Sequence, residues 1–368
     1  MRGGRVLAAA IAVTSVAAMA PASSAPSGTL RQMSLAEKAG QLVMFAVAGT
    51  GLSASERALI KRHHLGGVIL FERNYRDRAQ LRDLTARIQT VVRRGSGHGI
   101  GALISVDQEG GVVKRFPDLP PWRSHPEIGA TGDPSIAYDQ GRATGGALRR
   151  AGVNVNLAPV ADLDLPPEHV MRSRSFGRRA SRAARMTRSF ARGLQSRRTA
   201  ATAKHFPGLG GATINSDFGR AYVYRSKSQL RRVDAVPFQR AVDAGLKLMM
   251  LSHGIYVNDG GHRPASVNRY IATKRLRRGF GFTGVAISDA LEPVAWKFDG
   301  SVPRACRATI WAGADIALIT GNAEAARACV REIVRAVRSG AISRSRITRS
   351  VRRILELKRW LGVFDPAQ

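Results

Sequence analysis

Short apolar runs recur along the chain, separated by longer stretches with helical periodicity. Eight such runs are bounded by turn residues: Leu42–Ala48, Gly67–Phe71, Ala102–Val106, Val155–Val160, Ala200–Lys204, Leu248–Ser252, Val285–Ser288 and Ile316–Thr320. Amphipathic stretches predicted to be helices cover Ser53–His64, Arg78–Arg93, Pro134–Ala151, Ser181–Arg197, Lys227–Ala244, Ala265–Gly279, Pro303–Ala312, Ala323–Arg338 and Arg344–Leu361. This repeated alternation of strand and helix predicts an α/β protein with a closed (β/α)8 barrel of the TIM type.

The first 25 residues follow a different pattern. Arg2 and Arg5 precede an apolar stretch, Val6–Ala20, and small residues follow at Ala22 and Ala25. This order predicts a secretory signal peptide over residues 1–25, and hence a protein secreted or held in the cell envelope. The stretch is short for a membrane span, so no integral span is expected. No Pro-, Ser- or Gly-rich linker divides residues 26–368, which are predicted to form one barrel domain.

The charge balance is strongly basic. Lys and Arg number 58 against 26 Asp and Glu, a formal net charge of +32, part of which reflects genome composition. Such a surface concentrates near anionic polymers in a salt-dependent way, and for an exported protein these are polymers of the cell envelope. The basic residues are scattered, without a zinc-ligand cluster or an aromatic-studded basic motif, so no nucleic-acid partner is predicted.

The two cysteines, Cys306 and Cys329, both lie in stretches predicted to be helical. A disulfide between them is permitted in an oxidising compartment. Two buried free thiols are the alternative, and the sequence does not decide between them. Neither cysteine has the His partner that thiol catalysis would need.

Polar side chains stand where five of the eight predicted strands end. In chain order these are Asp107, Asp162, the pair Lys204 and His205, His253, and Asp289. The carboxyl ends of barrel strands meet at one rim, where barrel enzymes build their active sites. We therefore expect these groups to surround one cavity.

Sugar chemistry fits this set of groups best. The histidines lack a convincing third ligand for a metal, so no metal and no cofactor is predicted. Thr320-Gly321-Asn322 is a thin match to a phosphate-binding loop. Charged hydrogen-bonding groups suit sugar hydroxyls, and an anomeric carbon needs one carboxylate nucleophile with an acid about 5–5.5 Å away in retaining enzymes.

Five segments, in this order along the chain, resemble family 3 glycoside hydrolases, in particular their β-N-acetylhexosaminidases. They are Asp107–Arg115 (similar to DQEGGRVxR), Asn156–Asp162 (NxAPVxD), Arg174–Gly177 (RSFG), Lys204–Gly208 (KHFPG) and Gly281–Asp289 (GFxGVxxSD). Within this family, the chain resembles the single-domain members, which are similar to enzymes that remove N-acetylglucosamine from peptidoglycan fragments. The resemblance therefore implies a retaining glycosidase with a carbohydrate substrate carrying a β-linked amino sugar.

The resemblance also implies residue roles. Asp289 would be the catalytic nucleophile that forms a covalent glycosyl-enzyme intermediate. Side chains that would hold the sugar are Asp107, Arg115, Arg174, Lys204 and His205, and His253 would line the same pocket. The structural alternative for Asp289 is a buried ion pair with Lys204.

The sequence departs from the family in the loop after the fifth strand. Family members read KHFPGHGxxxxDSH there, and the last His donates the proton while the Asp before it orients that His. In this chain Leu209 replaces the first loop His, and Asn215-Ser216-Asp217 replaces Asp-Ser-His. Asp217 is the one titratable group left at these positions.

Two interpretations follow from this change. Asp217 could replace the His as acid/base, with its pKa raised by burial and by Asp289. Alternatively, the acid is lost and the protein binds envelope glycans without cleaving them. We favour the enzyme, because the implied nucleophile and sugar-binding residues are complete. A glycosyl transferase using phosphate or another sugar as acceptor is a further alternative, and a nucleic-acid binder is the weakest.

Overall fold

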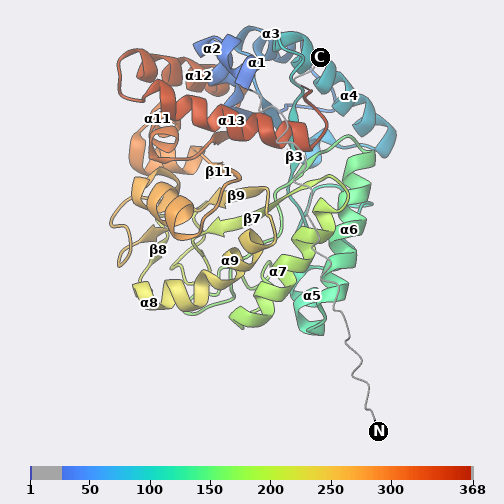
Figure 1. Cartoon of the computed structure of the whole chain (residues 1–368), viewed down its shortest axis with the longest axis vertical. Helices are drawn as coiled ribbons and strands as arrows, with labels where there is room; N and C mark the ends of the chain where they lie inside the picture. Colours follow the sequence, from blue (N-terminus) through green and yellow to red (C-terminus); the bar gives the residue numbers. More distant parts are fainter. Residues whose placement is uncertain (2–26, 366–368) are drawn as a thin grey trace.

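The computed structural model describes Met1 and residues 27–365. Apart from Met1, the predicted signal peptide therefore lies outside the described residues. The described chain contains a closed barrel of eight parallel strands, which confirms the predicted α/β barrel (Figure 1). In sequence order the strands are β1 (Val43–Ala46), β2 (Gly67–Leu70), β3 (Leu103–Val106), β6 (Val155–Asn156), β7 (Ala200–Phe206), β9 (Leu248–Leu251), β11 (Val285–Ala290) and β12 (Ile316–Ile319). Closure comes from pairing of β12 with β1.

Each predicted apolar run overlaps one barrel strand, and three of the differences at the strand ends bear on the site. Strand β6 stops at Asn156, because Pro159 has no N–H to continue the ladder, and only an isolated bridge joins Val160 to Lys204. Strand β7 runs on to Phe206 and β11 to Ala290. These extensions place His205 and Asp289 within strands at the rim.

Helices surround the barrel (Figure 1). The longer ones are α3 (Ala54–His63), α4 (Arg78–Gly95), α6 (Pro134–Arg150), α7 (Ala180–Gln195), α11 (Val302–Ala312), α12 (Ala323–Arg338) and α13 (Arg344–Trp360), and α1 (Ser27–Gln32), α2 (Leu35–Gln41) and α5 (His125–Thr131) are shorter. Local signals define several ends. For example, Ser53 and Glu56 form a capping box at the start of α3, and His64 closes it in the left-handed conformation.

Two predicted helices are interrupted. Lys227–Ala244 divides into α8 (Lys227–Gln229), a π-helical turn η2 (Leu230–Asp234) and α9 (Val236–Asp243), because Pro237 cannot donate a backbone hydrogen bond. Ala265–Gly279 divides into a 3₁₀ turn η3 (Ala265–Val267) and a π-helix η4 (Tyr270–Gly279). The Asn268 side chain accepts the N–H groups of Tyr270 and Ile271 and starts the second piece.

Short elements not predicted from the sequence lie between strand and helix. A hairpin of β4 (Gln108–Gly110) and β5 (Val113–Lys114) follows β3 directly. A second small sheet pairs β8 (Tyr222–Val223) with β10 (Ile255–Tyr256). After β11 come α10 (Glu292–Val294) and the π-helical turn η5 (Ala295–Asp299). Because each follows the carboxyl end of a barrel strand, these elements contribute to the walls around the barrel mouth.

The structure decides the state of the cysteines. Cys306 on α11 and Cys329 on α12 form a disulfide, with their Cα atoms 5.7 Å apart.

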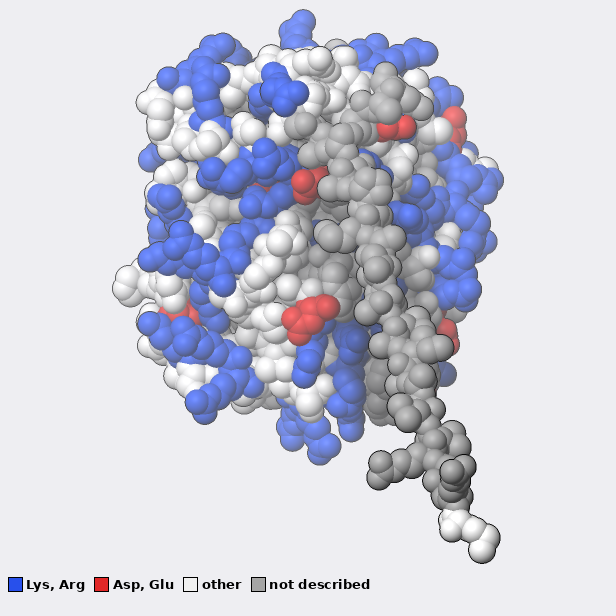
Figure 2. All heavy atoms as spheres, viewed as in Figure 1, with Lys and Arg blue, Asp and Glu red and all other residues white. Residues whose placement is uncertain are grey.

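Within the described residues, no helix is both long and apolar enough to span a bilayer. Figure 2 shows Lys and Arg spread over the visible part of one face of the molecule, with few Asp and Glu among them.

Candidate active site

A cavity of about 610 Å³ opens at the carboxyl ends of the barrel strands. Seven of the eight predicted site residues line it: Asp107, Arg115, Arg174, Lys204, His205, Asp217 and Asp289. They come from β7, β11 and the segments that follow β3, β5, β6 and β7. The structure thus brings together groups that are up to 182 positions apart in the sequence (107 to 289).

A buried ion cluster forms one side of the cavity. The carboxylate of Glu109 accepts two hydrogen bonds from Arg174, of 3.0 Å from Nε and 2.7 Å from Nη2. The Lys204 ammonium lies 2.6 Å from the same carboxylate and 2.5 Å from Oδ1 of Asp107. Burial opposes ionisation of Glu109, but the charges of Lys204 and Arg174 outweigh it and hold the pKa of this carboxyl well below its usual range.

Glu109 is the site residue to which the sequence assigned no role. It sits in the Asp107–Arg115 segment, but the resemblance gives it no function, and its side chain is 1% exposed. Its negative charge offsets the positive charges of Lys204 and Arg174, and Lys204 also binds Asp107 through Oδ1.

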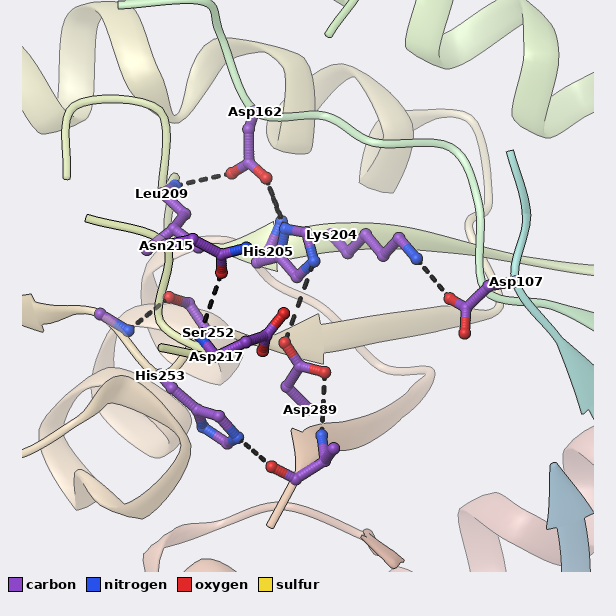
Figure 3. Close-up of polar contacts among 12 residues, drawn as sticks. Asp107, Asp162, Lys204, His205, Leu209, Asn215, Asp217, Ser252, His253 and Asp289 are labelled. Carbon is purple, nitrogen blue, oxygen red and sulfur yellow. Dashed lines mark hydrogen bonds and ion pairs between the residues drawn. The ribbon is translucent and has the colours of Figure 1, made fainter. Parts of the chain in front are cut away.

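His205 is held by a second buried carboxylate. Asp162 Oδ2 accepts hydrogen bonds from the backbone N–H of His205 (2.9 Å) and from its Nδ1 (2.6 Å), as Figure 3 shows. Asp162 Oδ1 accepts the N–H of Leu209 at 2.6 Å. The other ring nitrogen, Nε2, lies 3.9 Å from Asp289 Oδ2. Asp162 therefore orients the ring toward Asp289. The sequence placed Asp162 at the rim of the cavity, but its side chain is fully buried and is not part of the cavity lining.

Asp289 presents its carboxylate to the cavity from the end of β11. Its Oδ1 accepts the N–H of Ala290 at 2.8 Å. Burial disfavours the charged form, but His205, His253, the Ala290 N–H and Lys204 together lower the pKa of the carboxyl. No direct Asp289–Lys204 ion pair forms within the described residues, because Lys204 contacts Asp107 and Glu109 instead. The arrangement keeps Asp289 ionised and open to a ligand.

His253 lies behind the cavity wall rather than in it, which corrects the expectation that it lines the pocket. It is buried, its Nε2 hydrogen-bonds the carbonyl of Ala290, and its Nδ1 lies 2.8 Å from Ser266 Oγ. Since a carbonyl only accepts, Nε2 carries the proton. His253 follows β9, and its hydrogen bond to the Ala290 carbonyl supports the end of β11, which bears Asp289.

Asp217 reaches the same cavity from the loop after β7. Asn215, two residues earlier in the loop, accepts the Asp217 N–H on its side-chain oxygen at 3.0 Å. Figure 3 shows the carboxyl groups of Asp217 and Asp289 pointing toward one another. Asp217 as a residue is exposed at the pocket mouth, but protein atoms surround its carboxyl group. The resulting loss of hydration is the main cause that raises the pKa of this carboxyl, and the negative charge of Asp289 is the second.

The Asp217 loop is tied to the opposite wall by Lys297 on η5. The Lys297 ammonium donates to the carbonyls of Ser216 (3.1 Å), Asp217 (3.1 Å) and Gly219 (3.4 Å). Arg220 returns a hydrogen bond of 2.8 Å to the Lys297 carbonyl. The neighbouring Trp296 lines the pocket and is 78% exposed. The loop therefore has a defined position over the cavity.

Arg115 is held partly away from the cavity centre. It forms an ion pair of 2.7 Å with Glu72 in the 3₁₀ turn η1 (Glu72–Asn74) and packs over the ring of Phe71. It still lines the pocket.

No cluster of three or more His, Cys, Asp or Glu suited to a metal occurs in the described part of the chain.

Comparison with known proteins agrees with this geometry. Residues 34–357 match the model of the Glycosyl hydrolase family 3 N terminal domain. The chain is 34% identical over 301 residues to a beta-hexosaminidase of Nitrosospira multiformis, covering 79% of this chain and 83% of that protein. It is 33% identical over 331 residues to an uncharacterized secreted glycosyl hydrolase of Arthroderma benhamiae, covering 88% and 93%.

A solved structure gives the same result at the level of the fold. The glycoside hydrolase family 3 beta-N-acetylglucosaminidase of a Paenibacillus species superposes with a TM-score of 0.85 at 34% identity. The match covers 90% of this chain but only 63% of that structure, so this chain corresponds to part of that longer protein. With the family model covering most of the chain and the relatives agreeing along it, the chain belongs to glycosyl hydrolase family 3 and is a glycosidase.

Proposed function

We propose that this chain is a retaining β-N-acetylhexosaminidase that releases β-linked N-acetylglucosamine from cell-wall-type glycans, with Asp289 as nucleophile and Asp217 as acid/base. One observation carries the proposal. Two carboxyl groups face each other across one cavity, and their surroundings push the pKa of Asp217 up and that of Asp289 down. Separated pKa values are what an acid and a nucleophile need at the same pH.

The first step follows from these protonation states. Asp289 attacks the anomeric carbon through a carboxylate oxygen, while Asp217 gives its proton to the departing glycosidic oxygen. The bond from the anomeric carbon to the leaving group breaks, and an ester to Asp289 forms. His205 lies next to Asp289 and is oriented by Asp162. It stabilises the negative charge of the Asp289 carboxylate before this group attacks the sugar and after the sugar has left it.

The second step reverses the roles. Asp217, now a carboxylate, removes a proton from a water molecule, whose oxygen attacks the anomeric carbon and displaces Asp289. The configuration at the anomeric carbon is therefore retained. Asp107 and Lys204 are placed to hold sugar hydroxyls, because both line the cavity and carry charged hydrogen-bonding groups.

Two substrates separate the roles of the carboxyl groups. One is an aryl β-N-acetylglucosaminide with a good leaving group, which needs no proton, and the other is the β-linked disaccharide of N-acetylglucosamine, which does. Asp289→Asn should lower kcat/KM on both by at least about 10³-fold. Asp217→Asn should lower it by about 10²–10⁴-fold on the disaccharide and by less than about 10-fold on the aryl substrate.

Glu356→Gln is the matched control, because it removes an exposed carboxylate on α13. It should leave both rates unchanged. Hydrolysis that survives Asp289→Asn would end the proposed mechanism. Full disaccharide activity in Asp217→Asn would show that another group supplies the proton.

We also propose that the protein is exported. The N-terminal pattern, the Cys306–Cys329 disulfide and the naming of the Arthroderma benhamiae relative as secreted support this. Sequencing the N-terminus of protein recovered outside the producing cells tests it. Cleavage near Ala25 is expected, and a mature protein that still begins at Met1 would contradict export by this signal.

A further inference from the structure

A second cavity, separate from the active site, lies between α4 and α6. It is a groove of about 600 Å³ and shares no lining residue with the active-site pocket. In Figure 1 these two helices follow one another along the right-hand edge of the molecule. Five arginines line the groove: Arg78, Arg82, Arg142, Arg150 and Arg197. Asp139 is the one carboxylate in this lining.

The spacing of these residues makes the groove continuous. Arg142, Gly146 and Arg150 recur at intervals of four on α6, which places them on one face. From Asp139 to Arg150 this face extends about 17 Å, at 1.5 Å per residue. Arg78 and Arg82 have the same spacing on α4 and form the facing wall. Small side chains such as Ala143 and Ala147 leave the space between the walls open.

The positive charge of the groove is largely uncompensated. Arg78 pairs with Asp118 at 2.7 Å. The other four arginines have no carboxylate within 4.0 Å in residues 27–365. Elsewhere on α4, by contrast, Arg87 pairs with Asp83. Like charges gathered without counter-charges destabilise a free protein, and a bound anion would relieve this repulsion.

We propose that this groove binds a phosphate-bearing polyanion along its length. Guanidinium groups bind phosphate oxygens in a two-pronged geometry, and arginines spread over about 17 Å suit a chain of repeated phosphates better than one small anion. The groove holds a single exposed aromatic ring, Trp122, and Lys114 covers one face of it at 4.7 Å. Single-stranded nucleic acids need successive rings for their bases, so the groove fits a polyanion without bases.

The test compares two variants with the same change in net charge. Arg82→Glu with Arg142→Glu reverses one charge on each wall of the groove. Arg349→Glu with Arg352→Glu does the same at exposed positions of α13, outside the groove. Binding of labelled inorganic polyphosphate is measured at about 0.15 M NaCl and over a range of salt. Hydrolysis of the aryl glycoside should be unchanged in both variants, which shows that each is folded.

The groove variant should bind polyphosphate at least about 10-fold more weakly, with a salt slope smaller by about two, because two phosphate contacts are lost. The α13 variant should change by less than about 3-fold. Equal losses in both variants would overturn the proposal, because binding would then follow net charge alone. Tighter groove-dependent binding of oligothymidylate than of polyphosphate would also overturn it, in favour of nucleic acid.

Discussion

Asp217 and Asp289 are the same side chain in two surroundings. Lost hydration raises the pKa of both, but His205, His253, a backbone N–H and Lys204 reverse the effect at Asp289, whereas the charge of Asp289 adds to it at Asp217. In the proposed mechanism, Asp217 is therefore the proton donor and Asp289 the nucleophile. The side chain of Asn215 helps to hold Asp217 in place, because it accepts the Asp217 N–H.

These pKa directions predict a bell-shaped dependence of kcat/KM on pH. Activity should rise as Asp289 loses its proton, below the usual range of an Asp near 3.9, and fall as Asp217 loses its proton, above that range. In Asp217→Asn, the falling limb should disappear when the substrate has a good leaving group. A falling limb that persists unchanged in this variant would assign it to a different group.

At the scale of elements, the Asp217 loop depends on a contact between two connections of the barrel. Lys297, on η5 after β11, donates to three carbonyls of the loop that follows β7. The loop and the strand carrying the nucleophile are therefore linked through η5. This link fits a short acid, because an Asp side chain reaches less far than a His and needs its backbone held close to the cavity.

Lys297→Met should loosen this loop while keeping most of the apolar stem of the side chain. We expect kcat/KM on the disaccharide to fall about 10-fold or more, because a misplaced acid transfers its proton poorly, with a smaller loss on the aryl substrate. Lys227→Met, an exposed lysine at the start of α8, is the control. Equal losses on the two substrates would mean that Lys297 acts on general stability rather than on the position of Asp217.

For the whole molecule, the dominant feature is a net charge of +32. Repulsion among exposed cations destabilises the compact state, and salt screens it over a Debye length of about 8–10 Å at physiological ionic strength. The arginine-lined groove lies on this surface and is a local concentration of the same charge. The barrel is stabilised against this repulsion by its apolar interior and by the disulfide between α11 and α12.

Raising NaCl from about 0.05 to about 0.5 M should therefore raise Tm by a few degrees, as screening relieves repulsion. Thermal unfolding at a series of salt concentrations measures this. The groove variant should start from a higher Tm at low salt and gain less from added salt, because part of the repulsion has been removed. A Tm that falls with NaCl would show that attractive ion pairs outweigh the repulsion.

Much of the site was predictable because chemistry and chain order are both visible in the sequence. Asp107 and Asp289 each follow an apolar run and Lys204 ends one, and parallel barrel strands bring such ends to one rim. Glu109 and Asp162 were harder to interpret, since their importance lies in what they contact. His253 was misplaced for the same reason: a polar residue after a strand can face the cavity or support the wall behind it.

By itself, the sequence determined the barrel, because eight apolar runs alternating with amphipathic stretches have few other ways to bury their surface. It also indicated which residues could do chemistry. Tertiary structure alone decided the pairing of the cysteines, the direction of each carboxyl group and the place of Lys297 beside Asp217. These depend on distances between segments far apart in sequence, and such distances arise only when the strands close into a barrel.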